Sequence, residues 1–181
     1  MLEQLAAWAR PLLQFPYILR TRRNHGLEHA TIHLLSGKNY RLSGRSDDTG
    51  FVVLGEVPTD ALERAAADAL RRMRNGEHGL AVHPNCGTNL VTTASIVSLI
   101  GLVGLGGSNR REGFNRLPAV MSAMMVAILY SPLLGMALQK HFTTEGDPGD
   151  LEILKVTRRE VRLPWSSEPL VVHRVATRSV L

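Results

Sequence analysis

The residues best suited to chemistry lie in "NHGLEHATIHLL", residues 24–35, which combines three histidines with a glutamate. His25, Glu28 and His29 form an H-x-x-E-H box, and on a helix two residues four apart share a face, so both imidazoles can bind one metal ion. Glu28 lies beside that face, where its carboxylate reaches a metal-bound water rather than the metal. His33 continues the stripe, but angular drift makes it a poorer ligand, and we expect it to pack locally. The box therefore predicts a zinc site with Glu28 as general base.

A catalytic zinc ion usually takes three protein ligands, so one more is needed. The segment "HPNCGTN" supplies the best candidates, and our order is His83, then Cys86, then Glu77. Asn85 and Asn89 are candidates to bind a substrate carbonyl or backbone. Two alternatives stay open: this segment only forms a turn that caps the next helix, or Cys86 is a nucleophile paired with a histidine. The remaining histidines have no motif around them and are expected at the surface or an interface: His78, His141 and His173.

Two long apolar stretches follow this segment. Residues 84–109 and 117–139 contain no Asp, Glu, Lys or Arg, and the link between them, "GSNRREGFNR", is polar. A helix needs about 20 apolar residues to cross roughly 30 Å of hydrocarbon, and both stretches reach that length. The alternative is two buried helices of a soluble protein, but a chain of 181 residues has little left to cover them. The sequence predicts a transmembrane hairpin of undetermined orientation.

Charge and side-chain size suggest partners for this chain. The net charge of +5 and a pI near 10 come with only 5% aromatic residues, which argues against nucleic acid and favours a lipid bilayer with anionic head groups. Ala119, Ala123 and Ala127 form a stripe of small residues, typical of close helix packing in lipid, and predict a homo-oligomer. Residues 1–23 predict an interfacial amphipathic helix.

The remaining elements indicate an α+β fold. Residues 40–55 read as two short strands around a polar turn, residues 57–76 as an amphipathic helix, and residues 79–89 as a short strand that runs into a turn. Two further strands are expected in residues 150–163 and 169–180. We therefore predict a small α-β-β-α-β layer with a two-helix transmembrane hairpin and a C-terminal β pair. The expected domains are residues 1–23, 24–89 (the α+β domain with the histidine helix), 90–139 (the hairpin) and 140–181 (the β pair, packing on the α+β domain).

The H-x-x-E-H box resembles that of the inverzincins, the pitrilysin, insulinase and mitochondrial processing peptidase group. The likeness covers about residues 24–73, through "HGLEHATIHLLSGK" and "SGRSDDTGFVVLGEVPTDALERAAADAL". It implies that His25 and His29 are zinc ligands and that Glu28 is the base. The chain departs from that group, which takes its third ligand from a glutamate on a further helix, has longer domains and lacks a membrane hairpin.

Over nearly its full length the chain is similar to a family of uncharacterised bacterial membrane proteins, on the boxes N-H-x-L-E-H-A-T and H-P-N-C-G-T-N followed by two apolar helices. This second resemblance implies a multi-pass protein of the bacterial inner membrane and no particular activity. The leading hypothesis is a membrane-anchored zinc metalloprotease that hydrolyses a peptide or protein substrate. The alternative is a non-catalytic membrane protein that binds a metal or a partner.

Overall fold

A computed structural model of the chain describes residues 2–37, 40–162, 164 and 168–180. The chain forms two compact units: Met1–His83 together with Lys140–Leu181, and Pro84–Gln139. The second unit is thus an insertion between the two parts of the first. The hairpin unit begins a few residues before the expected boundary at residue 90.

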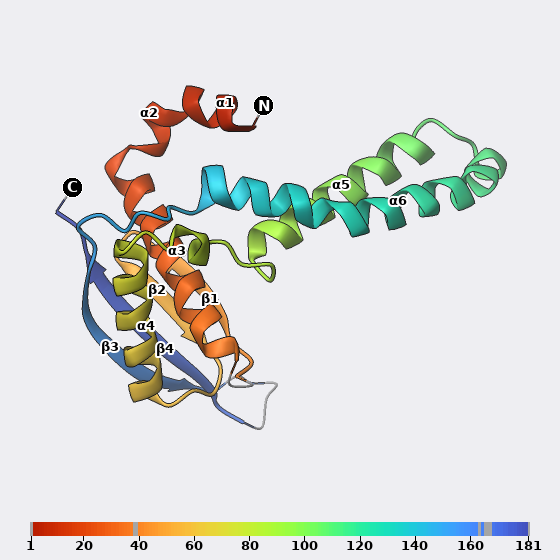
Figure 1. Ribbon diagram of the computed structural model, residues 1–181. Coiled ribbons are helices and arrows are strands. Elements are labelled where there is room, and N and C mark those ends of the chain that lie inside the picture. The colour runs from red at the N-terminus through yellow and green to blue at the C-terminus, as the bar shows by residue number, and fades with distance from the viewer. Residues whose placement is uncertain (1, 38–39, 163, 165–167, 181) are drawn as a thin grey trace. The chain divides into compact units, whose positions relative to one another are not determined.

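The first unit is built on a four-stranded antiparallel sheet (Figure 1). Its strands are β1 (Ser43–Asp47), β2 (Gly50–Leu54), β3 (Glu152–Val161) and β4 (Leu170–Arg178), in the order β1-β2-β4-β3. All four strands were expected, and the α+β class is confirmed. The C-terminal pair joins the same sheet as β1 and β2, because β4 pairs with β2. The alternating buried side chains of β2 and β4, such as Phe51 opposite Val175, explain this pairing.

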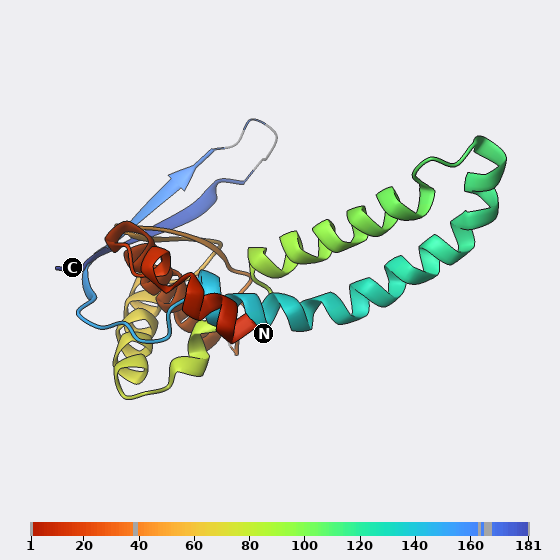
Figure 2. The same ribbon diagram turned by 90° about the horizontal axis from the view of Figure 1, so that it is seen from above.

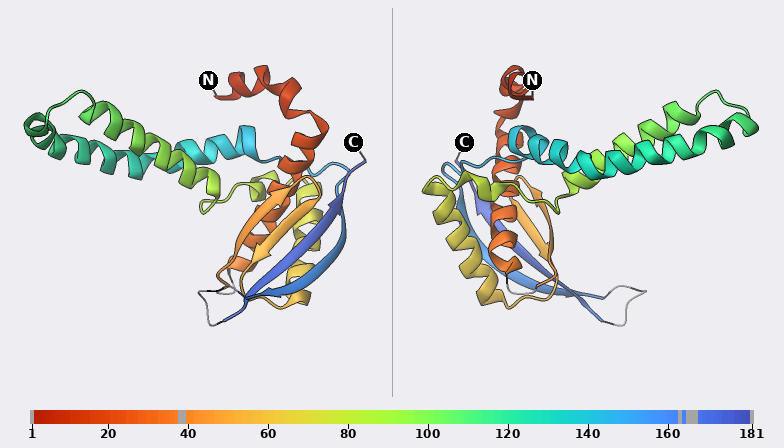
Figure 3. Two further views of the ribbon diagram at one scale, coloured as in Figure 1. Left: turned by 180° about the vertical axis from the view of Figure 1, so that it is seen from behind. Right: turned by 45° about the vertical axis from the view of Figure 1, so that its right-hand side comes forward.

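Two helices cover one face of the sheet, α3 (Pro16–Ser36) and α4 (Thr59–Arg74), as Figure 3 shows. Helix α4 is the amphipathic helix expected from the sequence, with apolar residues at helical spacing on its buried side. The core between helices and sheet consists mainly of Leu27, Ala30, Leu35, Phe51, Val53, Val57, Leu62, Ala69, Met73, Leu151 and Val175. This core fixes α3 against β1, β2 and α4.

The expected short strand at residues 79–89 is wrong. This segment contains a single 3-10 turn, η1 (His78–Ala81), and helix α5 begins at Gly87. Gly76 has a positive φ of 96°, a backbone conformation that glycine adopts readily where a helix ends, and η1 follows within two residues. Ala81 is instead buried, and η1 packs against α3.

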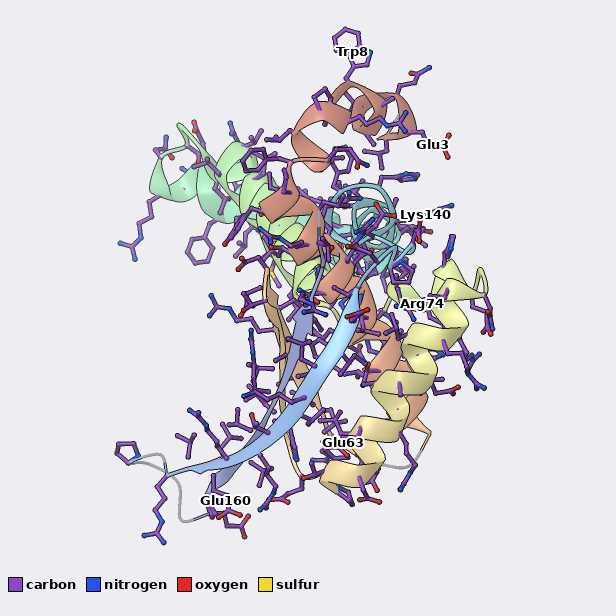
Figure 4. The ribbon with its side chains drawn as sticks, turned by 90° about the vertical axis from the view of Figure 1, so that its left-hand side faces the viewer. Glu3, Trp8, Glu63, Arg74, Lys140 and Glu160 are labelled. Atoms are coloured by element: carbon purple, nitrogen blue, oxygen red, sulfur yellow. The ribbon has the colours of Figure 1, made fainter. Side chains whose placement is uncertain are left out.

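The N-terminal residues form three helical segments rather than one. These are α1 (Leu2–Trp8), α2 (Arg10–Leu13) and the beginning of α3 at Pro16, where proline starts the helix. The expected boundary between residues 23 and 24 therefore falls inside α3. Trp8 points away from α1 and is 88% exposed (Figure 4).

The second unit is a helical hairpin of α5 (Gly87–Leu105) and α6 (Arg110–Leu138), seen side by side in Figure 2. A π-helical turn, η2 (Gln139–Thr143), follows α6. Both helices are long and apolar enough to cross a membrane, and only 11% of the most apolar window of each is buried. A core helix of a soluble protein is mostly buried, and neither of these helices is.

The seam between α5 and α6 combines close contacts with paired polar groups. A Cβ on Gly104 would lie 2.5 Å from a methyl group of Val120, so the helices approach closely there. Thr93 and Ser131 share a hydrogen bond of 2.6 Å between their hydroxyl oxygens. Internal pairing of this kind is what an apolar environment requires.

The predicted alanine stripe borders this seam. Ala119 and Ala123 line a hollow of about 480 Å³ together with α5 residues such as Leu99 and Val103. Ala127 is half-buried. Oligomerisation through these three alanines stays a prediction.

Gly26, in the middle of α3, permits a close approach of two other segments. A Cβ at this position would lie 2.2 Å from the carbonyl oxygen of Glu145 and 3.2 Å from the Cβ of Ala81. The nearest atom belongs to the backbone and cannot rotate away. The chain after η2 and the turn η1 can therefore contact α3 only if residue 26 is glycine.

Gly26→Ala should lower the melting temperature of the protein in detergent by about 5 °C. Overpacking costs about 1–3 kcal/mol, which exceeds the gain of up to about 1 kcal/mol in helix propensity, and each kcal/mol moves the melting temperature of a domain this size by roughly 2–4 °C. Gly37→Ala is the matched control, because nothing lies within 4 Å of its added Cβ. A Gly26→Ala protein that melts no lower than Gly37→Ala would contradict the argument.

Candidate metal site

The structure brings three predicted ligands together within the first unit. His25 and His29 lie one turn apart on α3, with ring centroids 4.3 Å apart and ring planes at 64°. The ring of His83, which follows η1, has its centroid 6.0 Å from that of His29. His29 is buried, whereas His25 and His83 are partly exposed.

Backbone carbonyl groups orient both histidines of the box. His29 Nδ1 lies 2.8 Å from the carbonyl oxygen of Ala81, and His25 Nδ1 lies 2.9 Å from that of Thr143. A carbonyl oxygen only accepts hydrogen bonds, so each neutral ring carries its proton on Nδ1 and its lone pair on Nε2. Ala81 and Thr143 are the last residues of η1 and η2, where carbonyl groups lack partners within the helical turn. Metal-binding histidines are typically oriented by such a contact.

Arg22 holds one of these carbonyl-bearing segments in place. Its guanidinium donates to the carbonyl oxygens of Phe142 and Thr144, at 2.8 and 2.9 Å, and forms an ion pair of 3.2 Å with Glu145. The side chain is buried, and burial lowers the pKa of Arg22, while the charge of Glu145 acts in the opposite direction. Because Arg22 lies one turn before His25, the same helix carries the ligand and fixes the group that orients it.

The carboxylate of Glu28 is buried against strand β1. The residue is 4% exposed, and the Ser46 hydroxyl donates a hydrogen bond to its Oε2 atom. Gly44 has no side chain that would displace the other oxygen, since a Cβ there would overlap with Oε1. Burial raises the pKa of Glu28, and the Ser46 hydrogen bond and the charge of His25 counter only part of this effect. Glu28 thus provides an oriented carboxylate beside the histidines.

Imidazole nitrogens are ligands that suit a zinc ion. With Zn–N distances near 2.0–2.1 Å, two imidazoles on a tetrahedral zinc have their centroids roughly 5 Å apart. The observed separations of 4.3 and 6.0 Å lie on either side of this value. Burial lowers the pKa of His83, and the charges of His29 and His33 lower it further, which favours the neutral ring that binds metals.

Three of the other predicted site residues have hydrogen-bond partners outside the box. Glu77 pairs with Arg72, whose Nε lies 3.0 Å from Oε1, on the exposed surface. In the second unit, Cys86 caps α5 by accepting a hydrogen bond from the Thr88 amide. Asn89 also belongs to that unit and joins the hairpin seam, accepting from Gln139 at 2.9 Å. The binding roles of Cys86, Glu77, Asn89 and the exposed Asn85 stay predictions.

The observed environments of two histidines differ from those expected from the sequence. His173 was expected at the surface or an interface, and this is wrong: it is fully buried on β4, with Nε2 3.1 Å from the Thr59 hydroxyl. The alternation of β4 directs this side chain toward the helices, because position 173 shares a face with the buried Val171 and Val175. His33 is exposed, and its ring centroid lies 6.3 Å from that of His83.

Sequence reasoning missed the residues that hold the site together. Arg22, Gly44 and Ser46 carry no motif, and their partners are distant in the sequence. Gly26 gave the one signal that could have been used, because a glycine inside a helix usually marks a close contact.

The fold and site define an α+β protein with a histidine box on a central helix and an apolar helical hairpin. The chain belongs to the family described as a domain of unknown function (DUF6391), which matches residues 20–156. It is 34% identical over 142 residues to an uncharacterized protein of Picosynechococcus sp., across 70% of this chain and 67% of that protein. No solved structure matches the chain. The matched span of the family includes the box, His83 and the hairpin.

Nitrogen-15 NMR of the metal-free protein should show His29 with its proton on Nδ1. The spectrum is recorded near pH 8, where an ordinary histidine is neutral, and His29→Gln assigns the signal. The exposed His78 serves as comparison. A His29 ring protonated on Nε2 instead would show that the Ala81 carbonyl does not set the tautomer.

Proposed function

We propose that this protein is a membrane-anchored zinc metallopeptidase. The observation that carries the proposal is the arrangement of the box: two histidines oriented through Nδ1, a third ring beside them, and a buried carboxylate held by Ser46. His25, His29 and His83 would hold the ion. A zinc ion with three protein ligands supplies Lewis-acid catalysis, polarising a carbonyl and acidifying a water molecule.

Glu28 is the proposed general base. With Oε2 engaged by Ser46, Oε1 beside Gly44 is the atom that takes a proton from the attacking water and later returns it to the leaving amine. A peptide bond is the substrate class that the resemblance to the inverzincins implies. Both residues of β1 that touch Glu28 would act as positioning residues, since neither has a group that takes part in proton transfer.

The hairpin is the proposed membrane anchor. Its two helices are apolar and largely unburied, and the first turns of α6 contain several arginines, which supports a crossing of the bilayer by α5 and a return by α6. The two parts of the first unit would then lie on the same side. We propose the inner membrane of a bacterium as the location, with the exposed Trp8 in the lipid–water interface.

The purified wild-type protein should bind one zinc ion, and His25→Ala, His29→Ala or His83→Ala should each lose it. Glu28→Gln should keep the ion, because residue 28 is not a ligand, and should reduce hydrolysis at least about 10²-fold through loss of the base. Metal analysis and cleavage of a mixed set of internally quenched peptides measure the two effects, with His78→Ala as control. Equal peptide cleavage by wild type and Glu28→Gln would refute the assignment of the base.

If the wild type binds zinc but cleaves peptides no faster than Glu28→Gln does, the peptidase proposal fails. The protein would then be a non-catalytic metal-binding protein, as in the alternative drawn from the sequence. If the purified protein contains no metal and its melting temperature does not rise when zinc is added, the metal site is excluded as well.

Cysteine labelling tests the anchor. In a Cys86→Ser background, Asn75→Cys and Lys155→Cys report on the two parts of the first unit, and Ser108→Cys reports on the loop. In sealed vesicles, a membrane-impermeant maleimide added outside should react either with both Asn75→Cys and Lys155→Cys or with neither. Ser108→Cys should show the opposite result. The same labelling of all three cysteines would show that the hairpin does not cross the membrane.

A further inference from the structure

His33 is a fourth imidazole next to the three proposed ligands. It lies on α3 one turn after His29, is exposed, and has its ring centroid 6.3 Å from that of His83, with the ring planes at 88°. The ring centroid of His83 therefore lies 6.0 Å from that of His29 and 6.3 Å from that of His33. Neither the box nor the proposed hydrolysis uses His33.

A pair of imidazoles at this spacing can bind a divalent transition metal weakly. Two rings on one tetrahedral zinc have centroids roughly 5 Å apart, so the His33 ring needs to move by about 1 Å, and an exposed side chain can do so by rotation. A pair provides fewer ligands than the inner set of three. A metal ion bound by the outer pair therefore moves on quickly when the inner site is vacant, because the inner site offers more ligands.

We propose that His33 and His83 form an outer position that first captures a divalent metal ion, which then passes to His25, His29 and His83. This inference rests on the proposed function, because it requires that the inner histidines bind the ion. His83 is common to both positions, so it can keep hold of the ion while His33 is exchanged for the buried His29. No bond between nonmetal atoms forms or breaks in this transfer.

The transfer has a distinctive kinetic consequence. A transiently occupied intermediate on the binding pathway lowers the free-energy barriers to metal binding and to metal release by the same amount. Removing His33 should therefore slow the binding and the release of the ion by the same factor and leave the dissociation constant unchanged. A ligand of the inner site would behave differently, because its loss weakens binding at equilibrium.

The test uses the full-length, metal-free protein in detergent micelles and Co²⁺, whose visible absorption reports binding. Stopped-flow mixing measures uptake, and an excess of chelator measures release. His33→Ala should slow both about tenfold, equivalent to about 1.4 kcal/mol, at unchanged stoichiometry. His33→Glu, which restores a metal-binding group, should recover much of the rate. His78→Ala controls for the loss of any exposed histidine.

The possible failures are separable. If His33→Ala takes up and releases one Co²⁺ ion at the wild-type rates, the outer position is refuted while the proposed metal site stands. If His33→Ala no longer binds the ion tightly, His33 is an inner ligand and the proposal is equally refuted. If the wild type binds no Co²⁺ or Zn²⁺, the proposed function fails first.

Discussion

The structure depends on satisfying the polar side chains of one buried helix. Residues 26–32 of α3 are all buried, so this helix has no solvent-facing side in its central turns. An unpaired buried donor or acceptor costs about 1–3 kcal/mol, which favours a partner for the buried polar groups of this helix. Those partners come from different segments: Asn24 bonds to β1 and β4, Glu28 to β1, His29 to η1, and Arg22 to the chain after η2. The surrounding segments are docked on α3 by these contacts.

The same contacts that dock the segments also prepare the candidate site. Ala81 and Thr143 end helical turns, and their carbonyl groups need donors that those turns do not supply. His25 and His29 meet this need through Nδ1 and thereby have Nε2 as the lone-pair atom. One set of hydrogen bonds thus both pairs these carbonyl groups and orients the two imidazole rings, as the proposed metal site requires.

Local signals in the sequence predicted much of this architecture. The spacing in α4, the polar turn between β1 and β2, and the uncharged stretches of α5 and α6 each depend on neighbouring residues. The box was visible because its members lie within one helix, and the proximity of His83 followed from an expected turn. The tautomers, the burial of His173 and the roles of Arg22 and Gly26 depend on residues far away in the chain. These features depend on tertiary contacts, which cannot be inferred from the local pattern of a single sequence.

The place of β4 in the sheet has a consequence for the order of folding. Strand β4 separates β2 from β3, yet it is made only after the entire second unit, and the segment carrying Thr143 also follows that unit. During synthesis, the first 83 residues therefore emerge with an unpaired strand edge and without the Thr143 carbonyl group that orients His25. Such non-local pairing is slow to form and leaves apolar surface exposed meanwhile. The nascent protein is thus vulnerable to aggregation and proteolysis until β4 has been made, and the candidate site is assembled only after the segment with Thr143 has been made.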